Sequence, residues 1–432
     1  MERTEIQNLK NAVDTEVTIS GWVDVARDQG KMAFFDFRDG TGFVQGVVFG
    51  KPEVLEIAKT LRPEWVVSVT GKVNKRPEKM VNEGVDNGDI ELEITGIEVL
   101  SEAQELPFEK DTELNLDTYL DNMPLTLRSE KARKIFKTQA AITKAYREAL
   151  NGKDFVEFQA PKLVGDDAEG GGNVFKVEYF HDKDAYLATS PQLYKQIMVG
   201  VFEKVFSVGN VFRAEKHSTT RHLNEYTSLD AEFGFIKDHH DVMEILSGVM
   251  RQIAVVVQDV AEIKIPKEIP SMKLREAQAI ISKETGEDCT NEPDLEPAHE
   301  RWLSEYALKE FDSDFIFITH YPVSKRPFYT YEDEEDKGFT KSFDLLFRGV
   351  EITTGGQRVH DYNTLLEKMK EKGLNPEDFS FYLQAFKYGM PPHGGWGMGL
   401  ERLTQKILRL ENVKEATLFP REMNRIDTLL SE

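Results

Sequence analysis

The chain has almost no cysteine and no long hydrophobic run. Its 432 residues include one cysteine, Cys289, which excludes an internal disulfide and a thiolate metal cluster. No stretch approaches the roughly eighteen apolar residues that a membrane span needs, and the opening residues contain no apolar core typical of a secretory signal. We therefore expect a cytoplasmic protein that does not bind a membrane.

Basic residues are also in deficit. The chain has 54 lysines and arginines against 76 acidic residues, which gives a net charge of −22. A broad basic surface is therefore not expected, and any contact with nucleic acid must depend on local patches. The length exceeds what one hydrophobic core usually supports, so it predicts two or three domains.

The first hundred residues alternate between apolar and polar side chains, as strands do. This alternation occupies residues 17–25, 32–49, 65–73 and 89–100. The second segment turns back at Asp39 and Gly40 and so supplies two strands, and a helix-like segment at 51–61 follows it. Five strands with a helix after the third are typical of an OB-type barrel, although other β-barrels fit the pattern too.

The remaining sequence predicts a larger second domain. We place the barrel domain at residues 1–105, a linker at 106–130, and an α+β domain at 131–432, because helices and strands there mix without regular βαβ order. Within it a helix is predicted to begin after Ser129 and to end near Gly152.

An acidic run at 331–336 reads as a solvated loop rather than a metal site. A helical stripe runs from Val242 to Ile253 and is interpreted as ordinary core.

Residues 212–230 combine charges in an unusual order. Arg213 and Glu215 share one face of a predicted strand, and a polar loop with Arg221 and His222 leads into a second strand near Tyr226. A hairpin with surface ion pairs would explain any one of these charges. The set as a whole favours a nucleotide site. On the second strand, alternation predicts a polar face of Ser228, Asp230 and Glu232 and an apolar face of Leu229, Ala231, Phe233 and Phe235.

Two later segments add to this set. Asp344 and Glu351 lie seven residues apart, and carboxylates near phosphates imply Mg²⁺, although solvated strand ends are the simpler alternative. Residues 391–408 contain four glycines before a helix that carries Arg402. Glycines allow the backbone to approach a ligand closely, which alone is a weak signal.

Together the three segments resemble, in type and order, the motifs of class II aminoacyl-tRNA synthetases, specifically the archaeal and eukaryotic-like aspartate type of subclass IIb. The resemblance extends from about residue 130 to the end of the chain, and the barrel resembles the anticodon-binding domain of the same subclass. It implies an N-terminal OB-fold followed by a catalytic domain with an antiparallel sheet flanked by helices. It also implies a homodimer, from a faint first motif around Pro161.

The activity implied by this resemblance is that of an aspartate–tRNA ligase. Such an enzyme activates L-aspartate with ATP and Mg²⁺ and transfers it from aspartyl-adenylate to the 3′ end of tRNA(Asp). Transfer to tRNA(Asn) as well is left open. An asparagine–tRNA ligase is one alternative. A fold-related asparagine synthetase is another, which the barrel argues against, and a non-catalytic protein would not need both Arg213 and Arg402.

The resemblance also assigns roles to individual residues. It implies that Arg213 and Arg402 are catalytic residues. It implies that ATP is bound by Arg213, Glu215, Arg221, His222, Tyr226, Glu351 and Arg402, and that the metal is bound by Asp344 and Glu351. It implies that aspartate is bound by Glu169, Gln192, Lys195, Asp230, Thr354 and Arg358. The anticodon would be read by Arg27, Phe34, Gln45 and Glu91.

Two of these residues favour aspartate over asparagine as the substrate. Relatives of the asparagine type usually lack a lysine at the place of Lys195 and tend to have glutamate at the place of Asp230. We expect asparagine to leave buried cations without a counter-charge, which is unfavourable. Simpler alternatives are a surface position for Lys195, an ordinary loop acid at Glu169 and an apolar filling role inside the barrel for Phe34.

Overall fold

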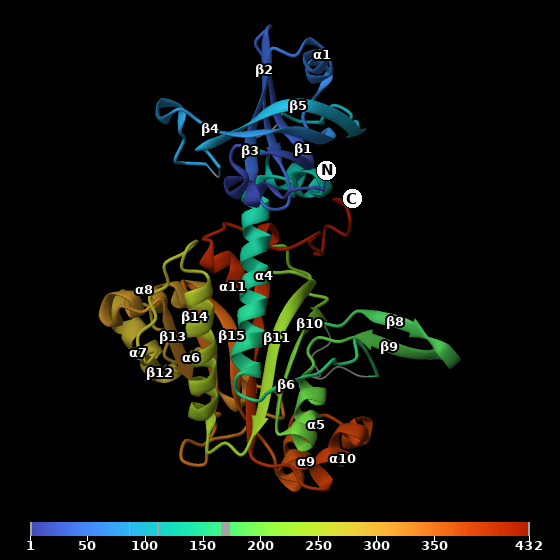
Figure 1. Cartoon of the computed structure of the whole chain (residues 1–432). Coiled ribbons are helices and arrows are strands. Elements are labelled where there is room, and N and C mark those ends of the chain that lie inside the picture. The colour runs from blue at the N-terminus through green and yellow to red at the C-terminus, as the bar shows by residue number, and fades with distance from the viewer. Residues whose placement is uncertain (1, 86, 110–111, 166–172, 431–432) are drawn as a thin grey trace. The chain divides into compact units, whose positions relative to one another are not determined.

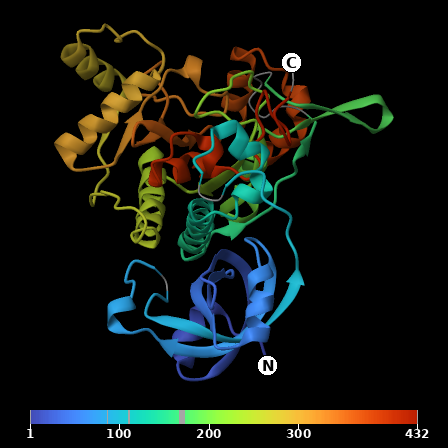
Figure 2. The same cartoon turned by 90° about the horizontal axis from the view of Figure 1, so that it is seen from above.

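The computed structural model describes residues 2–85, 87–109, 112–165 and 173–430 and contains two compact units, Met1–Thr112 and Glu113–Glu432. The units can be followed by colour in Figures 1 and 2, where the first is blue to light blue. Glu169 lies outside the described residues. In the described part of the chain no helix is both long enough and apolar enough to cross a membrane.

The first unit is a closed five-stranded barrel, which confirms the predicted OB-fold. Its strands are β1 (Glu16–Asp28), β2 (Met32–Arg38), β3 (Phe43–Phe49), β4 (Val66–Lys75) and β5 (Ile90–Ser101). They follow the order β1-β2-β3-β5-β4, and pairing of β1 with β4 closes the ring. Helix α1 (Pro52–Thr60) connects β3 to β4, and the 3-10 helices η1 (Ile6–Ala12) and η2 (Glu78–Met80) complete the unit.

Alternation along β2 decides which aromatic side chains fill the barrel. Phe35 and Phe37 are buried, and their rings stack with centroids 5.5 Å apart. Phe34, which precedes Phe35 in the strand, is only half-buried and lies on the opposite, outward face. The alternative that Phe34 fills the barrel is therefore excluded.

The second unit is built on an eight-stranded sheet of order β12-β13-β14-β15-β16-β11-β10-β6. Its strands are β6 (Val156–Glu157), β10 (Lys204–Phe212), β11 (Glu225–Gly234), β12 (Ser271–Lys273), β13 (Phe315–Thr319), β14 (Ser342–Phe347), β15 (Val350–Arg358) and β16 (His393–Gly399). The pairs β6–β10 and β12–β13 are parallel and the rest antiparallel. A small sheet, β7-β9-β8, comprises Leu163–Val164, Lys183–Leu187 and Lys176–Tyr179.

Helices surround this sheet, and α4 and α6 run along one face of it (Figure 1). The helices are α2 (Leu116–Asp121), α3 (Met123–Thr126), α4 (Glu130–Asn151), α5 (Gln192–Phe202), α6 (His239–Val256), α7 (Leu274–Thr285), α8 (Pro297–Phe311), α9 (Tyr362–Glu371), α10 (Ser380–Lys387) and α11 (Leu400–Ile407). The 3-10 helices are η3 (Phe180–Asp182), η4 (Val323–Lys325), η5 (Pro376–Phe379) and η6 (Val413–Ala416). The main core joins α4, α6 and α11 to the sheet, so the predicted Val242–Ile253 stripe is core.

The ends of helix α4 lie where its capping residues predict them. The Ser129 side chain accepts a hydrogen bond from the Ala132 amide and begins α4, and Gly152 ends it, as predicted. The segment expected to be a linker contains two short helices, α2 and α3, of which α2 is capped by Asn115. Neither helix is long enough to show a clear period of 3.6 residues.

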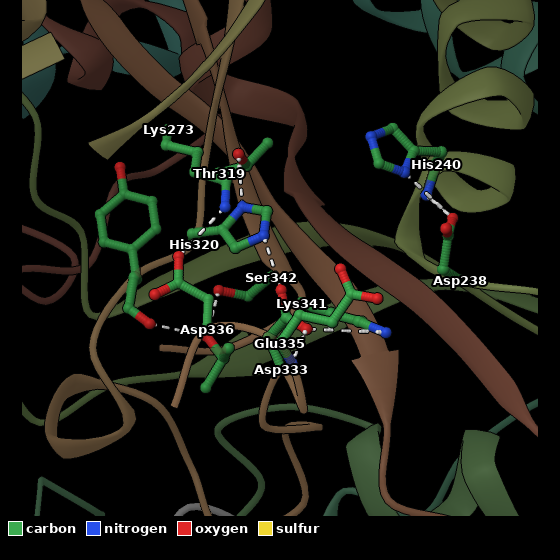
Figure 3. A network of polar contacts seen from close by, with 12 residues as sticks. Asp238, His240, Lys273, Thr319, His320, Asp333, Glu335, Asp336, Lys341 and Ser342 are labelled. Carbon is green, nitrogen blue, oxygen red and sulfur yellow. Dashed lines mark hydrogen bonds and ion pairs between the residues drawn. The ribbon is translucent and has the colours of Figure 1, made fainter. Parts of the chain in front are cut away.

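The acidic run at 331–336 is a turn held by ion pairs (Figure 3). Asp333 is buried and lies 3.1 Å from His320 Nε2, while Asp336 accepts a hydrogen bond from Lys273 Nζ at 3.0 Å. The interpretation of this run as a solvated loop holds for Glu334 and Glu335, which are exposed, but not for Asp333 and Asp336, whose partners come from segments distant in the sequence. Phe235 also departs from prediction, since it lies beyond β11 with a φ of 59° and is exposed.

Candidate active site

One pocket of about 580 Å³ lies over the middle of the eight-stranded sheet and gathers most of the candidate residues. The candidates that line it are Gln192, Lys195, Arg213, Glu215, Arg221, His222, Tyr226, Asp230, Glu351, Thr354, Arg358 and Arg402. Asp344 does not line the pocket. Residues separated by more than 200 positions in the chain therefore share one cavity because β10, β11, β16 and β15 are neighbours in the sheet.

The polar face of β11 points into this pocket. Ser228 and Asp230 line it, while Leu229, Ala231 and Phe233 on the opposite face belong to the main core. The alternation predicted for this strand is therefore correct for these residues. An ionisable strand face inside a protein is costly unless each charge has a partner.

Lys195 and Asp230 are joined at the buried end of the pocket. Lys195 on α5 is 1% exposed, and its Nζ lies 2.9 Å from Asp230 Oδ1 and 3.4 Å from Glu232 Oε2. Arg358 Nε donates to Glu232 Oε1 at 2.8 Å. Burial would raise the pKa of Glu232, but the charges of Arg358 and Lys195 hold that pKa below its ordinary value.

These contacts correct one expectation. The two cations, Lys195 and Arg358, already have counter-charges in Asp230 and Glu232, so they do not depend on a substrate carboxylate for neutralisation. The four side chains form a buried group of zero net charge. A surface position for Lys195 is also excluded by its burial.

The glycines of β16 also make room for the neighbouring strand β11. A Cβ atom at Gly395 would lie 2.0 Å from the Ala231 carbonyl oxygen and 2.3 Å from Glu232 Oε2. At Gly397 the nearest atom would be Asp230 Oδ1, at 3.1 Å. Gly397 lines the pocket, whereas Gly395 makes room for the neighbouring strand and its carboxylate. The absence of side chains on these glycines therefore lets β16 pack closely against β11 and also leaves space in the pocket for a ligand.

Three arginines of the pocket, Arg213, Arg221 and Arg402, lie beside the carboxylates Glu215, Glu300 and Glu351. Arg213 and Glu215 follow β10 rather than continuing it, because the strand ends at Phe212. The Arg213 guanidinium lies 5.8 Å from the ring centroid of Tyr226 and 3.8 Å from Glu215. Tyr226 therefore has one aromatic surface next to a cation inside the pocket.

The loop between β10 and β11 supplies two further candidates, Arg221 and His222. Arg221 Nη2 donates to both carboxylate oxygens of Glu300, at 3.0 and 2.8 Å. His222 Nε2 lies 3.8 Å from Glu215. Burial is the main cause that lowers the pKa of His222 below its usual value, and the charges of Arg402 and Arg221 act in the same direction. This shift favours the neutral form of the His222 side chain.

The two candidate metal ligands differ in their surroundings. Glu351 lines the pocket, accepts from Thr354 Oγ1 at 2.9 Å and lies 3.8 Å from Arg402 Nη1. Asp344 is buried behind the wall and pairs with Arg326 at 2.8 Å. Burial raises the pKa of Asp344 to about 6, with a further increase from the charge of Glu351. The two carboxylates therefore repel each other, which a shared cation would relieve.

The barrel candidates lie on outward positions of neighbouring strands. Arg27 pairs with Phe34 across β1 and β2, and its Nη2 donates to Asp36 Oδ2 at 2.8 Å. Arg76 Nη2 donates to Gln45 Oε1 at 2.6 Å, and its Nε lies 3.7 Å from Glu91. The four candidates thus fall into two neighbouring pairs on β1–β2 and on β3–β5.

Among the residues that the structure describes, five charged residues of the pocket region were not among the predicted site residues: Glu232, Glu300, Lys325, Arg326 and Glu401. Glu232 shared the predicted polar face with Asp230, and that position was a usable signal. Glu300 and Arg326 line the pocket but lie outside the three motif segments, and nothing in their local sequence marks them.

Comparisons with known proteins agree with this geometry. Residues 115–423 match the family model described as tRNA synthetases class II (D, K and N), and residues 17–100 match the model described as an OB-fold nucleic acid binding domain. Both matches fall on the two units of the structure.

Individual relatives are similar over nearly the whole chain. An aspartate–tRNA(Asp/Asn) ligase of Thermus thermophilus is 45% identical, with 98% of this chain and 99% of the relative covered. An aspartate–tRNA(Asp) ligase of Thermoplasma acidophilum is 40% identical, with 99% and 100% covered. Asparaginyl-tRNA synthetase of Pyrococcus horikoshii, solved with asparaginyl-adenylate, has a TM-score of 0.89 at 32% identity, with 99% of each chain covered.

The fold is therefore shared by relatives named for different amino acids, and the two quoted relatives named for aspartate have higher sequence identity than the quoted structure named for asparagine. The chain belongs to the class II aminoacyl-tRNA synthetases, in the family of the aspartate–tRNA ligases, which use ATP to form aminoacyl-tRNA.

Proposed function

We propose that this chain activates L-aspartate with ATP and transfers it to tRNA(Asp). The observation that carries the amino-acid assignment is the buried group of Lys195, Arg358, Asp230 and Glu232 at the end of the pocket. Two rigid cations at that depth suit a side-chain carboxylate, which accepts charge-assisted hydrogen bonds from both. The amide of asparagine would place an N–H₂ group against cations that can only donate.

In this proposal the substrate joins an existing ion network. The aspartate side chain would share Lys195 and Arg358 with Asp230 and Glu232, and Asp230 would also face the substrate ammonium. Gln192 and Thr354 line the same cavity and supply uncharged hydrogen bonds. Because the cations are already paired, selectivity would come from donor geometry more than from unpaired charge.

Activation requires the α-carboxylate of aspartate to attack the α-phosphorus of ATP, which brings two anions together. Arg213 and Arg402, which both line the pocket, would neutralise this charge without a general base. The ring of Tyr226 would stack on adenine. His222, Arg221 and Glu215 would position the nucleotide's phosphates and the loop that carries them.

Mg²⁺ fits the residues present. Glu351 offers carboxylate oxygens inside the pocket, and Asp344 offers a second carboxylate behind it whose pKa is raised by burial and then by Glu351. Oxygen ligands of this kind suit a hard cation. Glu351 would hold the ion directly, and Asp344 would support it. When bound, the ion would offset the negative charge of the ATP phosphates.

The barrel unit would bind the anticodon. Phe34 offers an outward aromatic surface, and Arg27, Gln45 and Glu91 offer polar groups beside it. The proposed acceptor is tRNA(Asp), which the names of both quoted aspartate relatives share, and tRNA(Asn) stays open as a second acceptor because the name of the Thermus relative includes it. A homodimer and a cytoplasmic location complete the proposal. The dimer is supported by the resemblance of the segment around Pro161 to the first class II motif.

Amino-acid-dependent exchange of pyrophosphate into ATP tests the activation step. Exchange supported by aspartate and at least a hundredfold weaker with asparagine is expected, because sites built for hydrogen bonding reject the wrong partner by large factors. Equal exchange with both amino acids would contradict the assignment of the buried group.

A further inference from the structure

Glu300 contacts the proposed nucleotide site although it belongs to none of the three motifs. It lies in the first turn of α8, and its side chain is 9% exposed. Helix α8 packs through Leu303 and Ala307 into a separate core cluster, so the Glu300 carboxylate projects from a fixed support. Its oxygens reach into the pocket that holds Arg221.

Glu300 completes a ring of four hydrogen-bonded residues. Arg221 donates through Nη2 to Glu300, and the Glu351 backbone N–H donates to Glu300 Oε2 at 3.2 Å. Arg402 closes the ring, because its Nε donates to the Arg221 carbonyl at 3.3 Å and its Nη1 to the Glu351 carbonyl at 3.3 Å. One residue from each motif segment is thus connected through a carboxylate from a fourth segment.

The contact leaves most of the Arg221 guanidinium available. Both hydrogen bonds to Glu300 use the same nitrogen, Nη2. No other residue in the described ranges is seen to hydrogen-bond the Nη1 and Nε groups of Arg221. A planar guanidinium held at one nitrogen presents its remaining N–H groups in a fixed direction, which is the geometry that phosphate binding uses.

The irregular backbone around Arg221 makes the restraint of its side chain by Glu300 useful for binding. Arg221 lies in the loop between β10 and β11, where the chain forms no regular helix or strand. A long side chain on such a loop has many rotamers to lose when it binds a ligand. An anchoring carboxylate removes that disorder before the nucleotide arrives.

We propose that Glu300 is a positioning residue for ATP, which fixes Arg221 so that its free edge meets the outer phosphates. The inference rests on the proposed role of Arg221. It predicts that Glu300 affects ligands that carry β- and γ-phosphates and not those that lack them. It makes helix α8 part of the nucleotide site although α8 contains no motif.

The test compares binding of ATP, pyrophosphate and AMP by calorimetry, in the absence of any amino acid. Glu300→Gln keeps the shape but loses the charge, and we expect it to raise the Kd of ATP and of pyrophosphate roughly tenfold while the Kd of AMP stays within about twofold. Glu305→Gln, an exposed change on the same helix, is the control and should alter none of them. Should the Gln variant not fold, Glu300→Asp, which withdraws the carboxylate by one methylene, carries the same expectation.

A double-mutant cycle separates positioning from a general effect on the pocket. Arg221→Ala should weaken ATP binding, and adding Glu300→Gln to it should cause no further loss. Equal weakening of ATP and AMP, unchanged ATP binding or tighter ATP binding in Glu300→Gln would each overturn the inference. Aspartate-dependent pyrophosphate exchange by the unaltered protein is measured alongside. If the unaltered protein showed no aspartate-dependent exchange, the proposed function would be rejected, whereas the binding measurements on Glu300→Gln would still stand.

Discussion

Lys195 Nζ lies 2.9 Å from Asp230 Oδ1, and the two side chains are 1% and 2% exposed. The pair joins α5 to strand β11, and both residues line the pocket. Ionic groups buried to this degree persist only when each is paired and hydrogen-bonded, and Lys195 also donates to the Trp396 carbonyl at 2.8 Å. In the proposed function this pair is the centre of amino-acid recognition.

Removal of Lys195 should impair aspartate use far more than ATP binding. In Lys195→Ala we expect kcat/KM for aspartate to fall at least a hundredfold and the Kd of ATP to change less than about threefold, because the lysine lies at the amino-acid end of the pocket. Pyrophosphate exchange at varied aspartate, with direct ATP titration, measures both. Lys195→Met preserves the volume, and Lys237→Ala at an exposed position serves as the control. Equal losses for both substrates would make Lys195 a structural residue.

Glu401 should make stability depend on pH. It is buried, accepts from the Thr227 amide at 2.9 and 3.1 Å, and burial raises its pKa to about 7 from an ordinary 4.5. The folded state therefore holds the proton more tightly than the unfolded state, so this contribution to stability is present below pH 4.5 and is lost as pH rises to about 7.

Glu401→Gln should remove that dependence. At pH 8 we expect the free energy of unfolding of the variant to exceed that of the unaltered protein by on the order of 3 kcal/mol. At pH 5 this difference should largely vanish. Urea denaturation at both pH values measures it, with the exposed Glu411→Gln as the matched change. A difference that is the same at both pH values would contradict the assigned pKa.

Phe34 should matter for tRNA and not for adenylate formation. A base stacked on an aromatic side chain contributes about 1–3 kcal/mol, so Phe34→Ala should raise the KM for tRNA(Asp) roughly tenfold or more. Pyrophosphate exchange, which needs no tRNA, should be unchanged. Phe49→Ala removes an aromatic ring that is 45% exposed on the neighbouring strand and is the control. A loss of similar size in Phe49→Ala would argue against a specific stacking site at Phe34.

Removal of Mg²⁺ should stop activation. Chelation is expected to abolish aspartate-dependent pyrophosphate exchange, and Glu351→Gln should raise the Mg²⁺ concentration needed for half-maximal exchange at least tenfold, since a neutral amide binds a hard cation poorly. Asp344→Asn should have the smaller effect, because Asp344 pairs with Arg326 behind the pocket wall. The reverse order of effects would place the ion on Asp344 instead.

Much of the fold could be predicted because the deciding signals are local. The barrel follows from alternating strands and one helix, and α4 follows from a serine cap and a glycine at its two ends. The polar and apolar faces of β11 likewise follow from the period of a strand. The short helices α2 and α3 were not predicted, because six and four residues show too little periodicity.

The missing parts of the candidate site depend on contacts between distant residues. Glu232 and Arg358 are 126 positions apart, and Arg221 and Glu300 are 79 positions apart. No local pattern connects such residues. The pairing of Lys195 and Arg358 with two carboxylates, and the hydrogen-bonded ring that includes Glu300, could therefore be seen only in the folded structure. The acidic turn at 331–336 is a similar case, since Lys273 and His320 come from other strands and loops.

Charging of purified tRNA(Asp) and tRNA(Asn) with radiolabelled aspartate and, separately, asparagine tests the central claim most directly. We predict transfer of aspartate to tRNA(Asp) and no transfer of asparagine to either RNA. The tRNA(Asn) arm with aspartate determines whether the acceptor range is wider than proposed. Failure to transfer aspartate to either tRNA, or transfer of asparagine to tRNA(Asn), would contradict the assignment of this chain to aspartate.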